Sequence, residues 1–184
     1  MTYPIISSIL SIVCFIIILL VGLLTSLLRE ENRVSKPYAR FSFSRVQLWL
    51  WTLVIIPLFA LNWGFVNSGK PFINETSLVL LGISGASTLT SAIITAVHLS
   101  NGNNKSALKV GKDSKNFFYD ILTDDHDQFS IGRLQNFVFT LVFIVIYVTY
   151  FFSNGKVYID FNPLVYTLMG ISAGTYLFAK ALFK

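Results

Sequence analysis

The chain has 184 residues and a formal net charge of +5, and 54% of its residues are hydrophobic while only 12% are charged. Its mean hydropathy of +0.66 is typical of helices that lie in lipid and excludes an ordinary water-soluble domain. The single cysteine, Cys14, excludes a disulfide within the chain.

Five apolar segments follow one another along the chain, at residues 5–28, 46–66, 78–98, 134–152 and 164–183. Each has about 20 residues, which as a helix cross a hydrocarbon layer of about 30 Å. The first lacks the basic start and the small-residue cleavage site of a signal peptide, so we expect it to remain as a span. The third is diluted by hydroxyl-bearing residues, but its counterpart later in the chain supports the same assignment.

One motif occurs twice, as FSFSRVQ at residues 41–47 and as FSIGRLQ at residues 129–135. The offset is 129 − 41 = 88, and it relates residues 41–96 to residues 129–184 without insertion or deletion. A chance match would not keep one register through two apolar segments and their connecting loop. We therefore predict a duplicated helical hairpin whose two copies cross the membrane in the same direction.

The predicted fold is an all-α integral membrane protein with five transmembrane helices, an N-terminal span followed by two parallel-repeat hairpins. Residues 1–40 form the N-terminal helix and a basic linker, and residues 41–100 form the first hairpin. Residues 101–128 form a cytoplasmic loop with a short amphipathic helix near residues 116–122, and residues 129–184 form the second hairpin.

Basic residues set the expected orientation. In the five-span topology 12 of the 14 Lys and Arg residues lie on one side, and only Lys70 and Lys156 lie on the other. The positive-inside rule then places the N-terminus outside and the C-terminus in the cytoplasm, in a bacterial inner membrane.

Small residues recur four apart in the second helix of each predicted hairpin, at Gly82 and Ala86 and at Gly170 and Gly174. Such pairs let two helix backbones approach closely in lipid, so we expect them to pack hairpins or protomers together. The neighbouring hydroxyl groups leave a second interpretation open, a hydroxyl-lined path for water or ions.

Arg45 and Arg133 stand where the first helix of each predicted hairpin begins, with Gln47 and Gln135 two residues later. The simplest interpretation is a pair of interfacial anchors that snorkel to the headgroups. In a symmetric oligomer the same four side chains would form a ring at a pore mouth, where guanidinium groups attract anions or phosphates.

The loop before the second hairpin is basic, and its lysines face lipid headgroups or a polyanionic partner. We take them as candidate gating or polyanion-binding residues: Lys105, Lys109, Lys112 and Lys115. Residues 124–127 are acidic and include His126, but they lack the spacing of a calcium loop, so we expect a solvated loop and no metal.

Several function classes are excluded by what the sequence lacks. No phosphate-binding loop, dinucleotide motif or catalytic triad is present, and little chain lies outside the spans, so we expect neither an enzyme nor a cofactor. No ionisable residue falls in the middle of a span, although ion-coupled transporters usually keep one there. A passive pore or a structural subunit is therefore favoured over a transporter.

The FSxxRxQ motif, a long apolar run and then LMGISAGTYL at residues 168–177 resemble a widespread group of bacterial multi-spanning membrane proteins that carry this hairpin twice. Phe178 replaces the second glycine of that group, and residues 85–87 read Gly-Ala-Ser in place of Ala-Gly-Thr. In size and architecture the chain is also similar to membrane effectors of bacterial anti-phage systems, such as the Hailong type. This resemblance implies a pore controlled by a nucleotide or oligonucleotide signal.

The sequence thus favours a homo-oligomeric, pore- or ion-channel-like effector that is gated through its cytoplasmic loops. The alternative is a non-conducting membrane scaffold that anchors a cytoplasmic partner protein.

Overall fold

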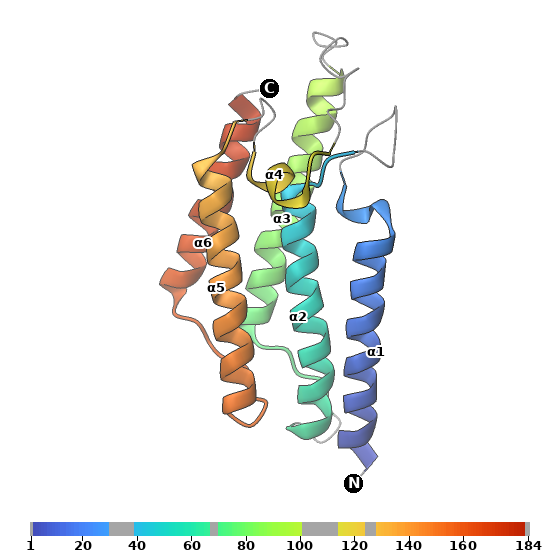
Figure 1. Cartoon of the computed structure of the whole chain (residues 1–184). Helices are drawn as coiled ribbons and strands as arrows, with labels where there is room; N and C mark the ends of the chain where they lie inside the picture. The colour runs from blue at the N-terminus through green and yellow to red at the C-terminus, as the bar shows by residue number, and fades with distance from the viewer. Residues whose placement is uncertain (1, 30–38, 67–69, 101–113, 124–127, 183–184) are drawn as a thin grey trace.

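The computed structural model describes residues 2–29, 39–66, 70–100, 114–123 and 128–182, which form a bundle of helices (Figure 1). Within these residues there is no β-strand, only two isolated bridges. The predicted all-α class is confirmed. The elements are α1 (Thr2–Leu24), the short 3₁₀ helix η1 (Ser26–Leu28), α2 (Phe43–Phe65), α3 (Glu75–Ser100), α4 (Phe117–Leu122), α5 (Ile131–Ser153) and α6 (Pro163–Leu182).

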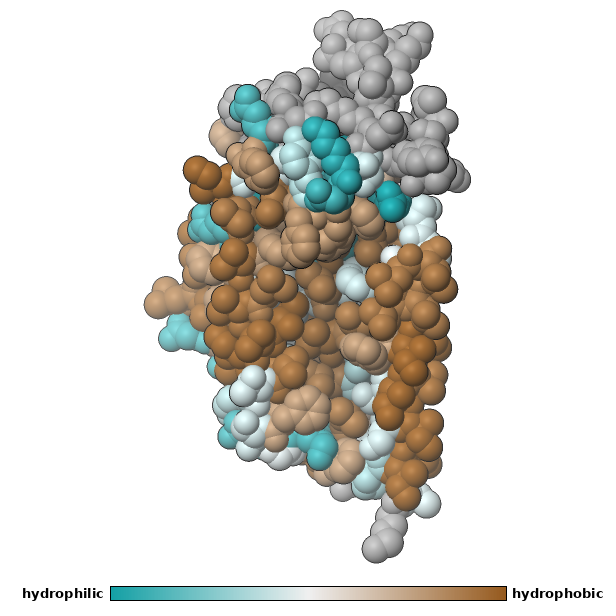
Figure 2. All heavy atoms as spheres, in the orientation of Figure 1, coloured by the Kyte–Doolittle hydropathy of each residue, from teal (hydrophilic) through white to brown (hydrophobic). Residues whose placement is uncertain are grey.

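The long helices have the length and composition of membrane helices. Four of them, α1, α2, α3 and α5, are long and apolar enough to cross a membrane, and α6 contributes a shorter apolar helix over Pro163–Phe178. Figure 2 shows the result on one face, where a broad apolar belt separates hydrophilic residues at the two ends of the bundle. The length and composition of these helices therefore fit a helical membrane protein.

The helix starts have the same spacing as the sequence motif. Helix α2 begins at Phe43 and α5 at Ile131, and both contain 23 residues. Helix α3 begins at Glu75 and α6 at Pro163, so the offset is again 163 − 75 = 88. We call α2 with α3 the first hairpin and α5 with α6 the second hairpin.

The two hairpins lie side by side, with α2 against α5 and α3 against α6, while α1 packs along α2. The N-terminus lies at one end of the bundle and the C-terminus at the other, on the side of α4 (Figure 1). Two glycines seat α1 on α2, because a Cβ atom at Gly22 would collide with Trp49 and one at Gly64 would collide with Ser7. The Trp49 Nε1 atom also donates to the Ile18 carbonyl oxygen at 2.9 Å.

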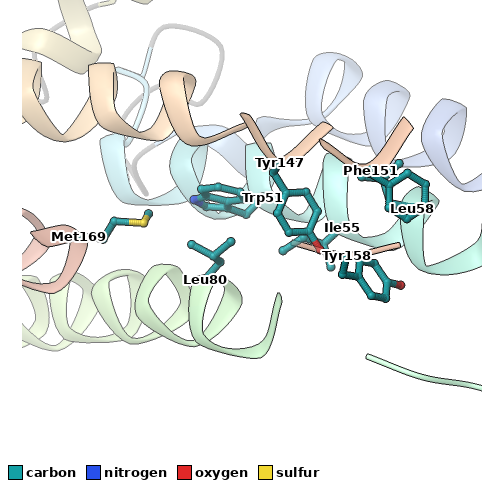
Figure 3. Packing of buried hydrophobic residues seen from close by; sticks show 8 residues of the cluster. All are labelled: Trp51, Ile55, Leu58, Leu80, Tyr147, Phe151, Tyr158 and Met169. Atoms are coloured by element: carbon teal, nitrogen blue, oxygen red, sulfur yellow. The ribbon is translucent and has the colours of Figure 1, made fainter. Parts of the chain in front are cut away.

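Aromatic and aliphatic side chains from both hairpins share one core (Figure 3). The Trp51 ring meets the Tyr147 ring edge-on, with their centroids 6.5 Å apart. Because Trp51 belongs to α2 and Tyr147 to α5, this contact ties the hairpins together. The fully or almost fully buried members are Trp51, Ile55, Leu58, Leu80, Tyr147, Phe151, Tyr158 and Met169.

The small-residue stripe takes no part in this contact. A Cβ atom added at Gly82, Gly170 or Gly174 would meet no other atom within 4 Å, and Ala86 is exposed. These residues therefore do not pack the two hairpins of one chain against each other, and the other predicted contact, between protomers, stays a prediction. Large side chains fill the interface between the hairpins instead, and the stripes face outward from the single chain.

Candidate functional site

Each hairpin is preceded by a short helix that is bonded to the start of the hairpin in the same way. The Ser42 amide donates to the carbonyl oxygen of Leu28, the last residue of η1, at 2.8 Å. The Ser130 amide donates to the Leu122 carbonyl oxygen at 2.9 Å, at the end of α4. Isolated bridges complete both junctions, between Arg29 and Phe41 and between Thr123 and Phe129.

The motif arginines close these junctions. The Arg45 Nη1 atom donates to the Arg29 carbonyl oxygen at 2.9 Å, and the Arg133 Nη1 atom donates to the Thr123 carbonyl oxygen. Arg29 and Thr123 are the C-cap residues of η1 and α4. In each copy, therefore, the arginine holds the end of a short helix against the first turn of a membrane helix, where carbonyl groups otherwise lack partners.

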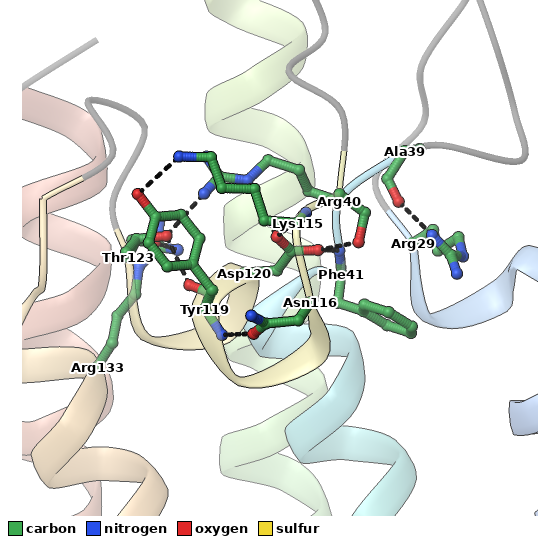
Figure 4. A network of polar contacts seen from close by, with 11 residues as sticks. Arg29, Ala39, Arg40, Phe41, Lys115, Asn116, Tyr119, Asp120, Thr123 and Arg133 are labelled. Carbon is green, nitrogen blue, oxygen red and sulfur yellow. Dashed lines mark hydrogen bonds and ion pairs between the residues drawn. The ribbon is translucent and has the colours of Figure 1, made fainter.

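Asp120 in α4 joins the two junctions (Figure 4). Asp120 is only 1% exposed, and its Oδ1 atom lies 3.6 Å from the Arg40 Nε atom. Its Oδ2 atom accepts from the Phe41 amide at 3.3 Å and from the Ser114 hydroxyl at 2.6 Å. The Lys115 amide donates to Oδ1 at 3.3 Å. The Asp120 carboxylate thus accepts three hydrogen bonds and faces one guanidinium group.

Arg40 makes a second contact with the same short helix, because its Nη2 atom donates to the Thr123 hydroxyl at 2.7 Å. Arg40 therefore connects the chain before α2 to both Asp120 and the α4 cap. We call this network the collar, and it comprises Arg29, Arg40, Phe41, Ser114, Asp120, Thr123 and Arg133.

The predicted loop of residues 101–128 carries the candidate gating lysines and also supplies three residues of the collar, Ser114, Asp120 and Thr123. Of the four candidate gating lysines, Lys115 is described, and its Nζ atom is 3.2 Å from the Tyr119 hydroxyl and 4.4 Å from the centre of that ring. Lys105, Lys109 and Lys112 lie outside the described residues. Lys115 directly follows Ser114, whose hydroxyl group donates to Asp120. A ligand bound to Lys115 would therefore lie next to a residue of the collar.

Deeper in the bundle, Gln47 bridges the hairpins. Its Nε2 atom donates to Asn136 Oδ1 and to Thr140 Oγ1, both at 3.0 Å, and Gln47 is only 3% exposed. These bonds join α2 to α5 inside the bundle. Gln135, the counterpart of Gln47 at the offset of 88, is exposed on α5.

Two further polar pairs join the hairpins toward the opposite end. The Ser77 hydroxyl lies 2.6 Å from the Tyr147 hydroxyl, and the Thr76 hydroxyl lies 2.5 Å from the Tyr166 hydroxyl. Each pair links α3 to a helix of the second hairpin. Polar contacts of this kind fix the register of two helices in lipid more than they add stability.

The four predicted pore-mouth residues do not gather at one place in the chain. Arg45 and Arg133 each bind a backbone carbonyl group, Gln47 lies between α2 and α5, and Gln135 is exposed. The sequence analysis did not identify Asp120 as a functional residue. The signal was present, because Asp120 is the one acidic residue within the apolar run of α4.

Among the described residues, no group of three or more side chains suited to metal binding comes together. Comparisons with protein-family models, with curated proteins and with solved structures found no match for this chain. The geometry of the collar and of the two hairpins is therefore the basis for the function proposed below.

Proposed function

We propose that this chain is a subunit of an oligomeric, pore- or channel-like membrane effector that is gated through the collar. Five spans place the N-terminus outside and the collar in the cytoplasm of a bacterial inner membrane. The gating signal is a nucleotide or oligonucleotide that binds the basic loop, and the biological setting is anti-phage defence.

The gating proposal rests on the contacts of Asp120. This carboxylate binds Ser114 and the Lys115 amide on the loop side, and it binds Arg40 and the Phe41 amide on the side of the first hairpin. Arg133 secures α4 to the second hairpin. A displacement of the loop would therefore reach both hairpins through one buried group.

The outward stripes of α3 and α6 support a path between copies. Gly82, Ala86, Gly170 and Gly174 are exposed, and Thr167 adds a hydroxyl group on the same side of α6. Helices that turn small residues toward a common axis leave room for water there, and hydroxyl groups supply polar contacts. These are the residues that we place along the path.

The five-span topology is supported by the lengths of the helices and by the positions of the termini. Helix α6 has 20 residues, which correspond to about 30 Å at 1.5 Å per residue. The N-terminus and the α4 end lie on opposite sides of the bundle (Figure 1), as an odd number of spans requires.

One observation favours the alternative, a non-conducting scaffold that presents the α4 end to a cytoplasmic partner protein. The guanidinium groups of Arg45 and Arg133 are both engaged with carbonyl groups of their own chain. They therefore contribute to the structure of the subunit, and a pore mouth built on them would require these bonds to be shared with an ion.

Purified protein in planar bilayers separates the two functions. The pore proposal predicts ion current that increases when cyclic nucleotides or short oligonucleotides are added on the side of the basic loop. Because such binding releases counterions, the concentration needed should rise steeply with salt. Changing Lys109, Lys112 and Lys115 together to Gln should abolish the response and leave insertion intact. Silent bilayers with correctly inserted protein would favour the scaffold.

A further inference from the structure

The two hairpins use different faces to contact each other. On the first hairpin the contact face contains Gln47, Trp51, Thr76, Ser77 and Leu80, all of them buried; we call it the Gln47 face. On the second hairpin it contains Thr140, Tyr147, Tyr166 and Met169, and we call it the Thr140 face. These residues do not correspond at the offset of 88, so the hairpins pack head to tail.

Each hairpin therefore carries a counterpart of the face that the other hairpin uses. On the second hairpin the counterpart of the Gln47 face is largely uncovered, with Gln135 exposed, Leu164 74% exposed and Leu168 36% exposed. We call it the Gln135 face, and it comprises Gln135, Phe139, Leu164, Val165 and Leu168.

On the first hairpin the counterpart of the Thr140 face is only partly covered. Thr52, Phe59 and Leu81 are half-buried, and Leu78 is 56% exposed. We call these four residues the Thr52 face. The second hairpin thus presents a Gln135 face and the first hairpin presents a partly covered Thr52 face, as the two sides of a head-to-tail interface would.

We propose that the Gln135 face of one copy docks on the Thr52 face of a second copy of this chain, repeating the packing of the two hairpins within the chain. The inference rests on the oligomer of the proposed function, and it names the surfaces that form it. Head-to-tail contacts of this type produce rings when their rotation closes.

The pairs that would meet between copies match in chemistry. Within the chain, Thr76 bonds the hydroxyl of Tyr166; the counterparts of this pair are Leu164 and Leu78, and both are apolar. A polar pair has thus been replaced on both sides together, which keeps an unpaired hydroxyl group out of the contact.

The second polar pair behaves in the same way. Within the chain, Ser77 bonds the hydroxyl of Tyr147, and the counterparts of this pair are Val165 and Phe59. Phenylalanine differs from tyrosine only by lacking the hydroxyl group, and it stands opposite valine, which cannot bond one. Both substitutions are those that a shared interface requires.

The bond of Gln47 to Thr140 is retained, whereas Asn136, the second acceptor of Gln47, corresponds to Leu48. Gln47 donates to Thr140 at 3.0 Å within the chain, and the counterparts Gln135 and Thr52 have the same side chains. An exposed amide on an apolar helix surface is costly in lipid, and Thr52 of the next copy supplies an acceptor. Because this glutamine–threonine pair is present in both copies of the repeat, a second copy of the chain fits the face better than lipid or an unrelated protein.

Cross-linking of cysteine variants in a Cys14→Ser background tests the docking. Leu78→Cys protein and Leu164→Cys protein are each reconstituted in vesicles alone, and then as a mixture, and treated with a short bis-maleimide. Covalent dimers are expected in the mixture, with little product from either variant alone. A chain that carries both cysteines should give a ladder of larger products. Ile16→Cys with Leu141→Cys serves as the matched control pair, because Ile16 is exposed on α1 and Leu141 is exposed on α5, about a third of a turn away from Gln135.

The outcomes separate this inference from the proposed function. Dimers formed equally by either single variant would mean a symmetric contact and would overturn the inference, as would a mixture that gives no more product than the control pair. A restored polar pair, Leu164→Thr with Leu78→Tyr, should assemble like the unchanged protein, whereas Leu164→Asp alone should not. If the ladder forms but bilayers show no current, the docking stands and the pore proposal fails.

Discussion

The Arg40 Nε atom lies 3.6 Å from the Asp120 Oδ1 atom, and this ion pair joins the chain before the first hairpin to the short helix before the second. The side chain of Asp120 is fully buried, whereas that of Arg40 is 12% exposed. The ion pair therefore lies at the edge of the apolar bundle. A conformational change in the basic loop would act on it there.

Changing Asp120→Asn should weaken the collar. The substitution keeps the shape of the side chain but removes the charge that Arg40 faces, and the amide nitrogen cannot accept the bonds made to the oxygen that it replaces. We expect the free energy of unfolding in mixed micelles to fall by about 2 kcal/mol. Glu75→Gln is the matched control, because Glu75 is exposed in the first turn of α3 and its neutralisation should change stability by less than about 1 kcal/mol. Equal effects of the two variants would contradict the role of Asp120.

The two glutamines of the repeated motif should respond differently to one substitution. Gln47→Leu removes the donor to Asn136 and Thr140 and should lower the stability of the single chain by about 1 kcal/mol. Gln135→Leu should leave the stability of the single chain unchanged, because Gln135 is exposed. Unfolding of both variants in detergent, under conditions that keep the chain monomeric, measures the difference. A larger loss for Gln135→Leu would show that its face is already covered within the chain.

The glycines that matter for folding should be Gly22 and Gly64, which lie in the contact between α1 and α2. A Cβ atom at Gly64 would lie 2.7 Å from the Tyr3 carbonyl oxygen, so Gly64→Ala should destabilise the α1–α2 contact by about 2 kcal/mol. Gly170→Ala should not affect folding, since nothing lies within 4 Å of the added atom. Protease accessibility of α1 in micelles reports the loosened contact, and equal digestion of both variants would argue against it.

The five-span topology predicts that the loop between α2 and α3 lies outside. In a Cys14→Ser background, a Lys70→Cys variant should react with a membrane-impermeant maleimide added to intact spheroplasts. Lys115→Cys, beside the collar, should react only after the membrane is opened. Labelling of Lys70→Cys from the cytoplasmic side alone would reverse the topology.

The positions of the helices could be predicted well from the sequence. The offset of 88 and the apolar runs place α2 and α5, which begin three residues before the predicted segments at 46 and 134. The short helix predicted near residues 116–122 is α4, at Phe117–Leu122. Hydropathy and repetition suffice for this because backbone hydrogen bonds must be satisfied inside each span.

The packing faces could not be predicted in the same way. A repeat implies that Gln47 and Gln135 have equal surroundings, but head-to-tail contact buries one and exposes the other. The glycines at 82 and 170 resemble a packing motif, yet the close contacts belong to Gly22 and Gly64. Which face of a helix meets a neighbour depends on where that neighbour lies, and the spacing of residues along one helix does not contain this information.

The head-to-tail packing also determines where an assembly would come apart. Inside a subunit, the two hairpins are joined covalently by the loop between them. The hydrogen bonds of Gln47, Ser77 and Thr76 also cross this interface, or seam. Between subunits, the corresponding seam would have no covalent crossing, and leucine, valine and phenylalanine would replace most of those polar groups. Force or thermal motion would then separate copies before it separated hairpins, so each subunit would move as a rigid block. Opening would occur at every second seam around the ring.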